Sequence, residues 1–259
     1  MSDGKKEILL GDCLELMKNI PNGSIDMILC DLPYGTTACK WDTIIQFDKL
    51  WEQYERIIKP NGAIALTASQ PFTSALVMSN PKLFRYEWIW EKNRGSNFAT
   101  VKYQPMKEHE SILVFSKDKH NYYPIKEERQ GLGKDRVKYK FQEERKNVSD
   151  NYGIKVKHKE FLTEDRVPRS IQKFNTETGL HPTQKPISLF EYLVKTYTNE
   201  NDLVLDNCAG SGTTAIACLK TNRQFIVMEK EQKYYDIILK RVGDFNKKFE
   251  PQTLFGNEM

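Results

Sequence analysis

The chain has 259 residues, 39% of them hydrophobic and 29% charged, and its 39 lysines and arginines outnumber its 35 acidic residues by four. This composition predicts a soluble protein with one good-sized core and space for an insertion, and the sequence has no apolar run long enough to span a membrane. Residues 1–7 contain no apolar stretch after their lysines, so we expect neither a signal peptide nor an anchor and a cytoplasmic location.

The five cysteines form no C-x-x-C pair, and none lies at metal-ligand spacing from a histidine. An odd number of isolated thiols in such a chain is typical of reduced cysteines that pack as small hydrophobic side chains. The sequence therefore predicts no metal site.

The first part of the chain alternates between strand and helix patterns. Apolar runs and turn residues predict strands over 8–10, 25–30, 63–68, 86–90 and 111–115, and helices over 13–19, 47–58 and 72–78. The strand over 25–30 leads directly into Asp31. This alternation is typical of an α/β protein with a doubly wound sheet, in which ligands bind beyond the carboxyl ends of the parallel strands.

The stretch 117–173 differs from the rest of the chain in charge and pattern. It holds 16 lysines and arginines against 10 acidic residues, whereas the remaining chain has 23 against 25. The basic excess fits a polyanion-binding surface and equally a solvated one. We interpret 117–178 as an insertion between two halves of one domain, 1–116 and 179–259.

The last part of the chain contains a second strand–helix–strand unit with a loop of small residues. We expect a helix over 188–197, strands over 203–206 and 224–228, a helix through Cys218 between these strands, and a final helix over 232 to about 245. The loop Asp206–Thr214 allows a ligand to approach the free N–H groups of a helix start, although a tight turn would use the same glycines. Glu229 ends the next strand, where an acid can bind the ribose hydroxyls of an adenosine. The loop lacks a P-loop lysine and the full G-x-G-x-x-G of nicotinamide binders.

The tetrapeptide Asp31-Leu32-Pro33-Tyr34 follows the buried strand over 25–30. Methylation of a base amino group needs acceptors for the amine hydrogens and an aromatic face against the base. Asp31 and the Leu32 carbonyl can supply the acceptors, Tyr34 the face, and Pro33 a stiff turn. The tetrapeptide therefore favours methyl transfer to an exocyclic amine.

Together, the tetrapeptide and the cofactor loop resemble the DNA amino-methyltransferases that carry an Asp-Pro-Pro-Tyr motif, in the group where the catalytic motif precedes the cofactor loop. The resemblance covers the whole chain. It implies a circularly permuted, Rossmann-like methyltransferase fold, S-adenosylmethionine as cofactor, and double-stranded DNA as substrate, with the target base flipped out of the helix. It also implies that 117–178 is the target-recognition region.

The resemblance further implies which residues form the site. The catalytic residues would be Asp31, Leu32, Pro33 and Tyr34. The cofactor-binding residues would be Asp12, Cys13, Asp31, Lys185, Asp206, Cys208, Ala209, Gly210, Ser211, Gly212, Thr213, Thr214 and Glu229. Asp12 would contact the adenine of the cofactor, and 181–186 would close over it. Two positions depart from the family pattern: Leu32 replaces its first proline, and Cys208 replaces an aromatic residue.

The sequence leaves several alternatives open. An aspartate at position 31 favours adenine N6 over cytosine N4 as the target, imperfectly. Enzymes that methylate a protein glutamine use a similar tetrapeptide, but in those the cofactor loop comes first. An inactive nucleic-acid-binding partner subunit is a further alternative, against which the intact site residues of this chain speak. A homodimer and a cognate restriction endonuclease remain open as partners, in a bacterial or phage-infected cell. His109, Glu110 and Asn97 are interpreted as hydrogen-bonded structural residues.

Overall fold

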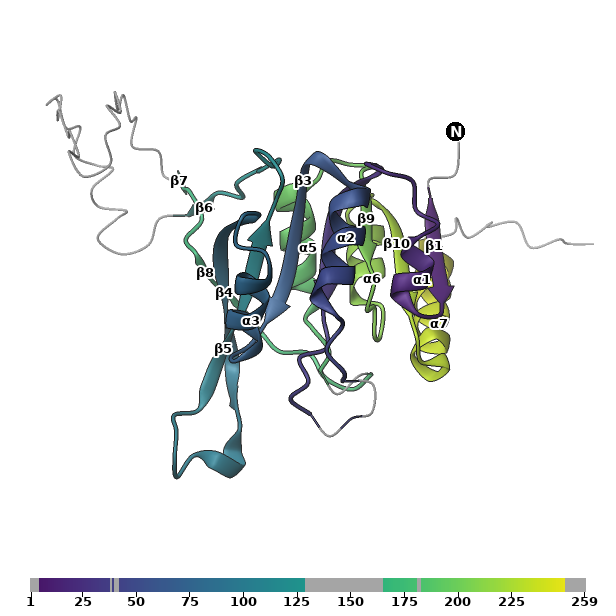
Figure 1. Ribbon diagram of the computed structural model, residues 1–259. Coiled ribbons are helices and arrows are strands. Elements are labelled where there is room, and N and C mark those ends of the chain that lie inside the picture. The colour runs from purple at the N-terminus through teal and green to yellow at the C-terminus, as the bar shows by residue number, and fades with distance from the viewer. Residues whose placement is uncertain (1–4, 38, 40–41, 129–164, 181–182, 250–259) are drawn as a thin grey trace, which may run out of the picture. The chain divides into compact units, whose positions relative to one another are not determined.

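The computed structural model describes residues 5–37, 39, 42–128, 165–180 and 183–249 (Figure 1). The chain forms two compact units, of which the first comprises residues 1–123 and 170–259 and the second comprises 124–169. An eight-stranded sheet in the first unit has the order β1-β10-β9-β2-β3-β5-β4-β8. These strands are β1 (Lys6–Leu10), β2 (Ile25–Asp31), β3 (Ile58–Ala68), β4 (Phe84–Ser96), β5 (Lys107–Phe115), β8 (Ile171–Phe174), β9 (Leu203–Asp206) and β10 (Gln224–Glu229).

The sheet is largely parallel. Strands β1, β10, β9, β2 and β3 run in one direction, and only β5 pairs antiparallel with its two neighbours, β3 and β4. The central strand β2 is buried along most of its length, as expected for a strand covered by helices on both faces. The carboxyl ends of the parallel strands therefore meet at one edge of the sheet.

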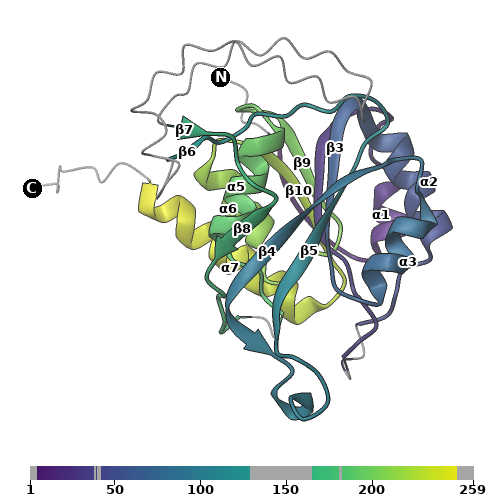
Figure 2. The same cartoon turned by 90° about the vertical axis from the view of Figure 1, so that its left-hand side faces the viewer.

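Helices cover both faces of the sheet (Figures 1 and 2). One face carries α1 (Cys13–Met17), α2 (Phe47–Ile57) and α3 (Phe72–Ser79), and the other carries α5 (Ile187–Tyr197), α6 (Thr213–Lys220) and α7 (Gln232–Phe249). Each helix presents an apolar stripe to the sheet. In α2 this stripe is Leu50, Trp51, Tyr54 and Ile57. The expected doubly wound α/β fold is confirmed.

The hairpin of β4 and β5 is longer than predicted and extends beyond the edge where the parallel strands end (Figure 1). Its loop contains a short 3-10 helix, η1 (Phe98–Thr100), and is closed by Asn97, whose side-chain oxygen accepts a 2.9 Å hydrogen bond from the Lys107 N–H. Tyr103 at the tip is 88% exposed. We call residues 97–106 the hairpin tip.

The second compact unit is shorter than the predicted insertion over 117–178. Residues 117–123 stay on the first unit because the N–H groups of Asn121 and Tyr123 bond to the carbonyls of Asn61 and Thr196. At the other boundary, β8 pairs with β4 and extends the main sheet. This strand was not predicted, since its residues alternate between exposed and half-buried at a sheet edge and form no apolar run.

The described part of the second unit is small. It contains β6 (Glu127–Glu128) paired antiparallel with β7 (Asp165–Arg166), and Arg166 forms a 3.0 Å ion pair with Glu127. Residues 129–164, which make up most of the predicted recognition region, lie outside the described residues. Within the described ranges, no helix is both long and apolar enough to cross a membrane.

Candidate active site

A cavity of about 740 Å³ opens at the carboxyl edge of the parallel strands, a volume in the usual range for ligand sites. Its walls come from the segments that follow β1, β2, β9 and β10, from β4 and β5, and from the segment before α5. The predicted site residues that line it are Asp12, Cys13, Asp31, Leu32, Pro33, Tyr34, Lys185, Asp206, Cys208, Ala209, Gly210, Ser211, Thr213 and Glu229. Gly212 and Thr214 do not line it, and His181 and Pro182 lie outside the described residues.

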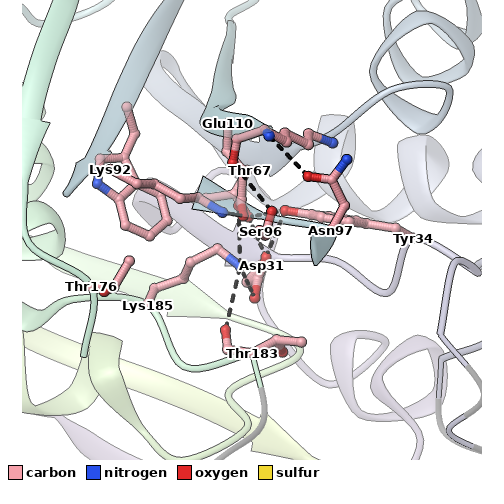
Figure 3. A network of polar contacts seen from close by, with 12 residues as sticks. Asp31, Tyr34, Thr67, Lys92, Ser96, Asn97, Glu110, Thr176, Thr183 and Lys185 are labelled. Atoms are coloured by element: carbon pink, nitrogen blue, oxygen red, sulfur yellow. Dashed lines mark hydrogen bonds and ion pairs between the residues drawn. The ribbon is translucent and has the colours of Figure 1, made fainter. Parts of the chain in front are cut away.

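Asp31 lies at the end of β2, and both of its carboxylate oxygens have partners (Figure 3). Oδ1 lies 2.9 Å from the Tyr34 hydroxyl and also accepts a hydrogen bond from the Thr67 hydroxyl of the neighbouring strand β3. Oδ2 accepts a 2.7 Å hydrogen bond from Nζ of Lys185. The carboxylate is thereby fixed toward the cavity by groups from three segments of the chain.

Tyr34 is held on two sides. Its hydroxyl lies 2.9 Å from the Thr67 hydroxyl, and its ring stacks on Phe72 with a centroid separation of 5.1 Å. Burial, together with the charges of Asp31 and Glu110, raises the pKa of Tyr34 well above its usual value. The side chain is therefore a neutral phenol at physiological pH.

Lys185 joins Asp31 to a second buried carboxylate, Glu110 of β5 (Figure 3). Its side chain is 6% exposed, and Nζ lies 3.5 Å from Glu110 Oε2. Glu110 also forms an ion pair with Lys92 of β4. Burial lowers the pKa of Lys185, but the charges of Asp31 and Glu110 outweigh it and raise the pKa overall. Burial likewise raises the pKa of Glu110, but Lys185 and Lys92 bring it below its usual value.

Ion pairs thus join acids and lysines in alternation, from Asp31 through Lys185 and Glu110 to Lys92. We call these four residues the charge chain. Glu110 was interpreted from the sequence as structural, together with His109. Successive side chains of β5 point to opposite faces of the sheet, so Glu110 lines the cavity while His109 is exposed.

The loop between β9 and α6 is organised by two buried acids. Asp206 accepts hydrogen bonds from the Cys208 N–H, at 3.0 Å, and from the Thr214 hydroxyl. Glu229 at the end of β10 accepts from the Gly210 N–H at 2.8 Å and from two further backbone N–H groups. Burial raises the pKa of Asp206 to about 7 and also raises that of Glu229. These bonds position the loop against the cavity.

Glycine is required in this loop. Gly210 and Gly212 have positive φ angles of 53° and 81°. A Cβ atom on Gly212 would lie 3.0 Å from side-chain atoms of Ile238 in α7. The loop can therefore pass between the cavity and α7 only with glycine at this position.

Comparison with known protein families gives one match to most of the chain. The model of the DNA methylase family matches residues 25–240. The chain belongs to this family. It is 29% identical over 282 residues to type II methyltransferase M.HinfI of Haemophilus influenzae, covering 94% of this chain and 70% of that protein. It is also 27% identical over 259 residues to DNA adenine methyltransferase YhdJ of Escherichia coli K12, covering 92% and 82% of the two chains.

Solved structures of methylases share the fold of this DNA methylase. The M1.HpyAVI–SAM complex superposes with a TM-score of 0.62 at 24% identity and covers 91% of this chain and 98% of that one. The cytosine-N4-specific PvuII DNA methyltransferase superposes with a TM-score of 0.64 at 15% identity, covering 97% and 88%. At these identities the likeness shows the Rossmann-like methyltransferase fold.

S-adenosylmethionine is the methyl donor of the family, and the residues of the cavity suit it. The lining contains eight carboxylates against four lysines, with neither arginine nor histidine among the described residues. Such a surface attracts a cationic sulfonium and would repel a phosphate-bearing cofactor. Glu229 and Asp12 add acceptors for hydroxyl and amino groups, and the loop backbone permits close approach.

Several residues that shape the site were absent from the sequence-based prediction, among them Thr67, Lys92 and Asp42. Thr67 and Lys92 lie within otherwise ordinary strand sequence, so no motif distinguishes them. Asp42 accepts hydrogen bonds from the N–H groups of Gly35, Thr36 and Thr37, at 2.8, 2.9 and 2.7 Å. Although burial raises the pKa of Asp42, these bonds lower it overall. Asp42 thereby ties down the chain directly after Tyr34.

Proposed function

We propose that this DNA methylase transfers a methyl group from S-adenosylmethionine to N6 of adenine in duplex DNA. One observation carries the proposal: Asp31 and Tyr34 open into the same cavity as the Gly210 loop and Glu229. A target amine and a nucleoside cofactor can therefore be brought together in one cavity. Positioning of this kind supplies much of the rate of a bimolecular transfer.

The chain's own groups would orient the target amine. Asp31 and the Leu32 carbonyl accept its N–H hydrogens, so that the nitrogen lone pair is directed at the methyl group. The Tyr34 ring, fixed by Phe72, offers its other face to the base. Because the reaction moves positive charge onto the nitrogen, a fixed carboxylate beside it lowers the barrier. The nitrogen would exchange one proton for the methyl group: the donor would leave as the neutral thioether, and the proton would pass to solvent water.

The cofactor, when bound, supplies an electrophilic methyl group. Glu229 would hold its ribose, Asp12 its adenine, and Cys208–Ser211 with Lys185 its methionine part. Leu32 replaces the family's proline, but its side chain is buried in the core and the expected contact is made by its carbonyl. The replacement therefore leaves the proposed acceptor in place.

The DNA would be bound by two parts of the chain. We assign sequence recognition to 117–178, whose basic excess suits phosphate contacts. We also assign a DNA contact to the hairpin tip, which extends from the cavity edge and carries Lys102 between the exposed Val101 and Tyr103, with exposed Phe98 nearby in the sequence. Apolar and aromatic side chains can stack in the space that a flipped-out base leaves in the duplex, and nearby cations can bind its phosphates.

Modified-base sequencing of genomic DNA from a host that expresses the protein tests the proposal. We expect N6-methyladenine at one short sequence and at no site in a host that expresses Asp31→Ala. N4-methylcytosine would support the alternative of cytosine methylation, as in the PvuII enzyme, and would contradict the adenine assignment. Unmodified DNA from a host that produces folded protein would support the inactive partner subunit.

A further inference from the structure

We propose that Glu110 is a positioning residue that receives the Lys185 ammonium when the target amine displaces it from Asp31. Lys185 Nζ binds Asp31 Oδ2, the oxygen that the amine would need. The proposal rests on the proposed function, since it concerns the entry of an amino base into the same cavity. Three independent features of the charge chain carry it (Figure 3).

The first feature is that Asp31 has no unused oxygen. Oδ1 is engaged by Tyr34, in the loop after β2, and by Thr67 of β3. Oδ2 is engaged by Lys185, which is carried by the segment before α5. Of the three side chains that bind Asp31, the lysine has the most rotatable bonds and can move most easily. An incoming amine can therefore gain a well-aligned hydrogen bond to Asp31 by replacing Lys185.

The second feature is the position of the ammonium relative to Tyr34. Lys185 Nζ lies over the Tyr34 ring, 5.6 Å from its centroid. Since Phe72 stacks on this ring, a base has only one remaining face to contact. The ammonium is thus close to both surfaces that a flipped base would use, the carboxylate and the ring.

The third feature is an open acceptor at the right place. Glu110 Oε2 is buried and accepts no hydrogen bond within the described part of the chain, although it lies only 3.5 Å from Lys185 Nζ. Oε1 of the same carboxylate already binds Lys92. A small rotation of the lysine side chain would satisfy Oε2, so the displaced ammonium stays paired inside the protein.

This transfer also has an electrostatic consequence. Methyl transfer develops positive charge on the amine nitrogen, and an ammonium that remained on Asp31 would oppose that charge. Its movement toward Glu110 leaves the Asp31 carboxylate free to stabilise the nitrogen. Glu110 would therefore act on the reaction through Lys185 without touching the substrate.

The main test is Glu110→Gln, which keeps the shape of the side chain and removes its charge. We expect kcat to fall about 10- to 100-fold while the KM for S-adenosylmethionine stays near the wild-type value. The melting temperature should fall, because Lys92 loses a buried partner. Glu110→Asp, which restores a carboxylate, should recover part of the rate. Glu87→Gln removes the same charge from an exposed position of β4 and should behave like the wild type.

A second readout does not depend on turnover. A 2-aminopurine placed next to the target adenine brightens when that adenine leaves the stack, and the target keeps its amine. We expect Glu110→Gln to give less fluorescence than the wild type, because the displaced ammonium has no carboxylate to receive it. Lys185→Met has no ammonium to displace and should give at least the wild-type fluorescence. The double variant Lys185→Met, Glu110→Gln should give nearly the same fluorescence as Lys185→Met alone.

Several results would overturn the inference. A Glu110→Gln variant with wild-type kcat and fluorescence would do so. Glu110→Gln would also contradict it by lowering the fluorescence as much in the Lys185→Met background as in the wild type. If Glu110→Gln does not fold, Glu110→Asp with the wild-type rate would decide against it. A wild-type protein that methylates no amino base would instead contradict the proposed function.

Discussion

At the scale of single residues, the prediction with the largest expected effect concerns Asp31. Its carboxylate is bound by Tyr34, Thr67 and Lys185, and we propose that it accepts the target amine. Asp31→Ala should nearly abolish methyl transfer, because the amine loses its acceptor and Lys185 its nearest partner. Single-turnover methylation of DNA measures this, with circular dichroism to establish that the variant is folded. Turnover close to wild type would refute the assignment.

Glu229 gives a prediction about the cofactor. Its carboxylate fixes the Gly210 loop and faces the cavity. Glu229→Ala should weaken S-adenosylmethionine binding by about 1–3 kcal/mol, the usual cost of leaving buried hydrogen-bonding groups without a partner. Isothermal titration calorimetry measures the change. An unchanged affinity would show that the ribose is held elsewhere.

Asp206 gives a prediction about pH. Burial raises its pKa from 3.8 in the unfolded chain to about 7 in the folded protein. The folded state therefore keeps a proton that the unfolded chain has released, so the contribution of this group to stability is present below about pH 4 and is lost as the pH rises to about 7. Asp206→Asn should remove this dependence. Melting temperatures of the two proteins between pH 4 and pH 8 would test it, and parallel curves would contradict it.

At the scale of elements, the hairpin of β4 and β5 has two parts with different roles. Its base carries Lys92 and Glu110 into the cavity, while its tip is exposed beyond the sheet. Because β5 is antiparallel to β3, the hairpin turns at the same edge where the parallel strands end. One element thus connects the proposed DNA surface to the charge chain.

Tyr103 tests this division of roles. We expect Tyr103→Ala to raise the KM for DNA several-fold, since base stacking on an aromatic side chain contributes about 1–3 kcal/mol. The affinity for S-adenosylmethionine should not change. Met78→Ala, at another exposed apolar position, serves as the control. An unchanged KM for DNA in Tyr103→Ala would exclude the hairpin tip from the interface.

At the scale of the whole molecule, we expect recognition and chemistry to be separable. The sheet unit holds the complete cavity, and the basic excess of the chain is concentrated in 117–173. DNA affinity should fall with salt by a slope of about −0.9 per neutralised phosphate, with fewer than the 16 available cations engaged. Titrations at several salt concentrations measure the slope.

A graft tests the same separation directly. Replacing 124–169, the second compact unit, with the corresponding segment of a relative of different specificity should change the methylated sequence without changing the methylated base. Modified-base sequencing identifies both. A graft that remains active on the original sequence would place recognition in the first unit, with the hairpin tip as the next candidate.

The sequence by itself was sufficient to predict the fold class, the family, and the fact that the two motifs meet. Local patterns carry this information, because buried parallel strands are apolar runs and a cofactor loop needs small residues next to a helix start. Once the strands are known to be parallel, their carboxyl ends must share one edge, so Asp31, Gly210 and Glu229 had to converge.

Only the tertiary structure decided what surrounds Asp31. Thr67, Lys92 and Glu110 come from three strands, and none has a local signal that distinguishes it from a solvated or structural residue. Lys185 was expected at the site from the family resemblance, but its ion pairs with Asp31 and Glu110 were not. The role of Lys92, Glu110 and Lys185 depends on burial, which joins them with Asp31 in one paired set of charges. The edge strand β8 likewise forms because it pairs with β4. Its half-exposed residues have no apolar pattern that would predict a strand from the sequence.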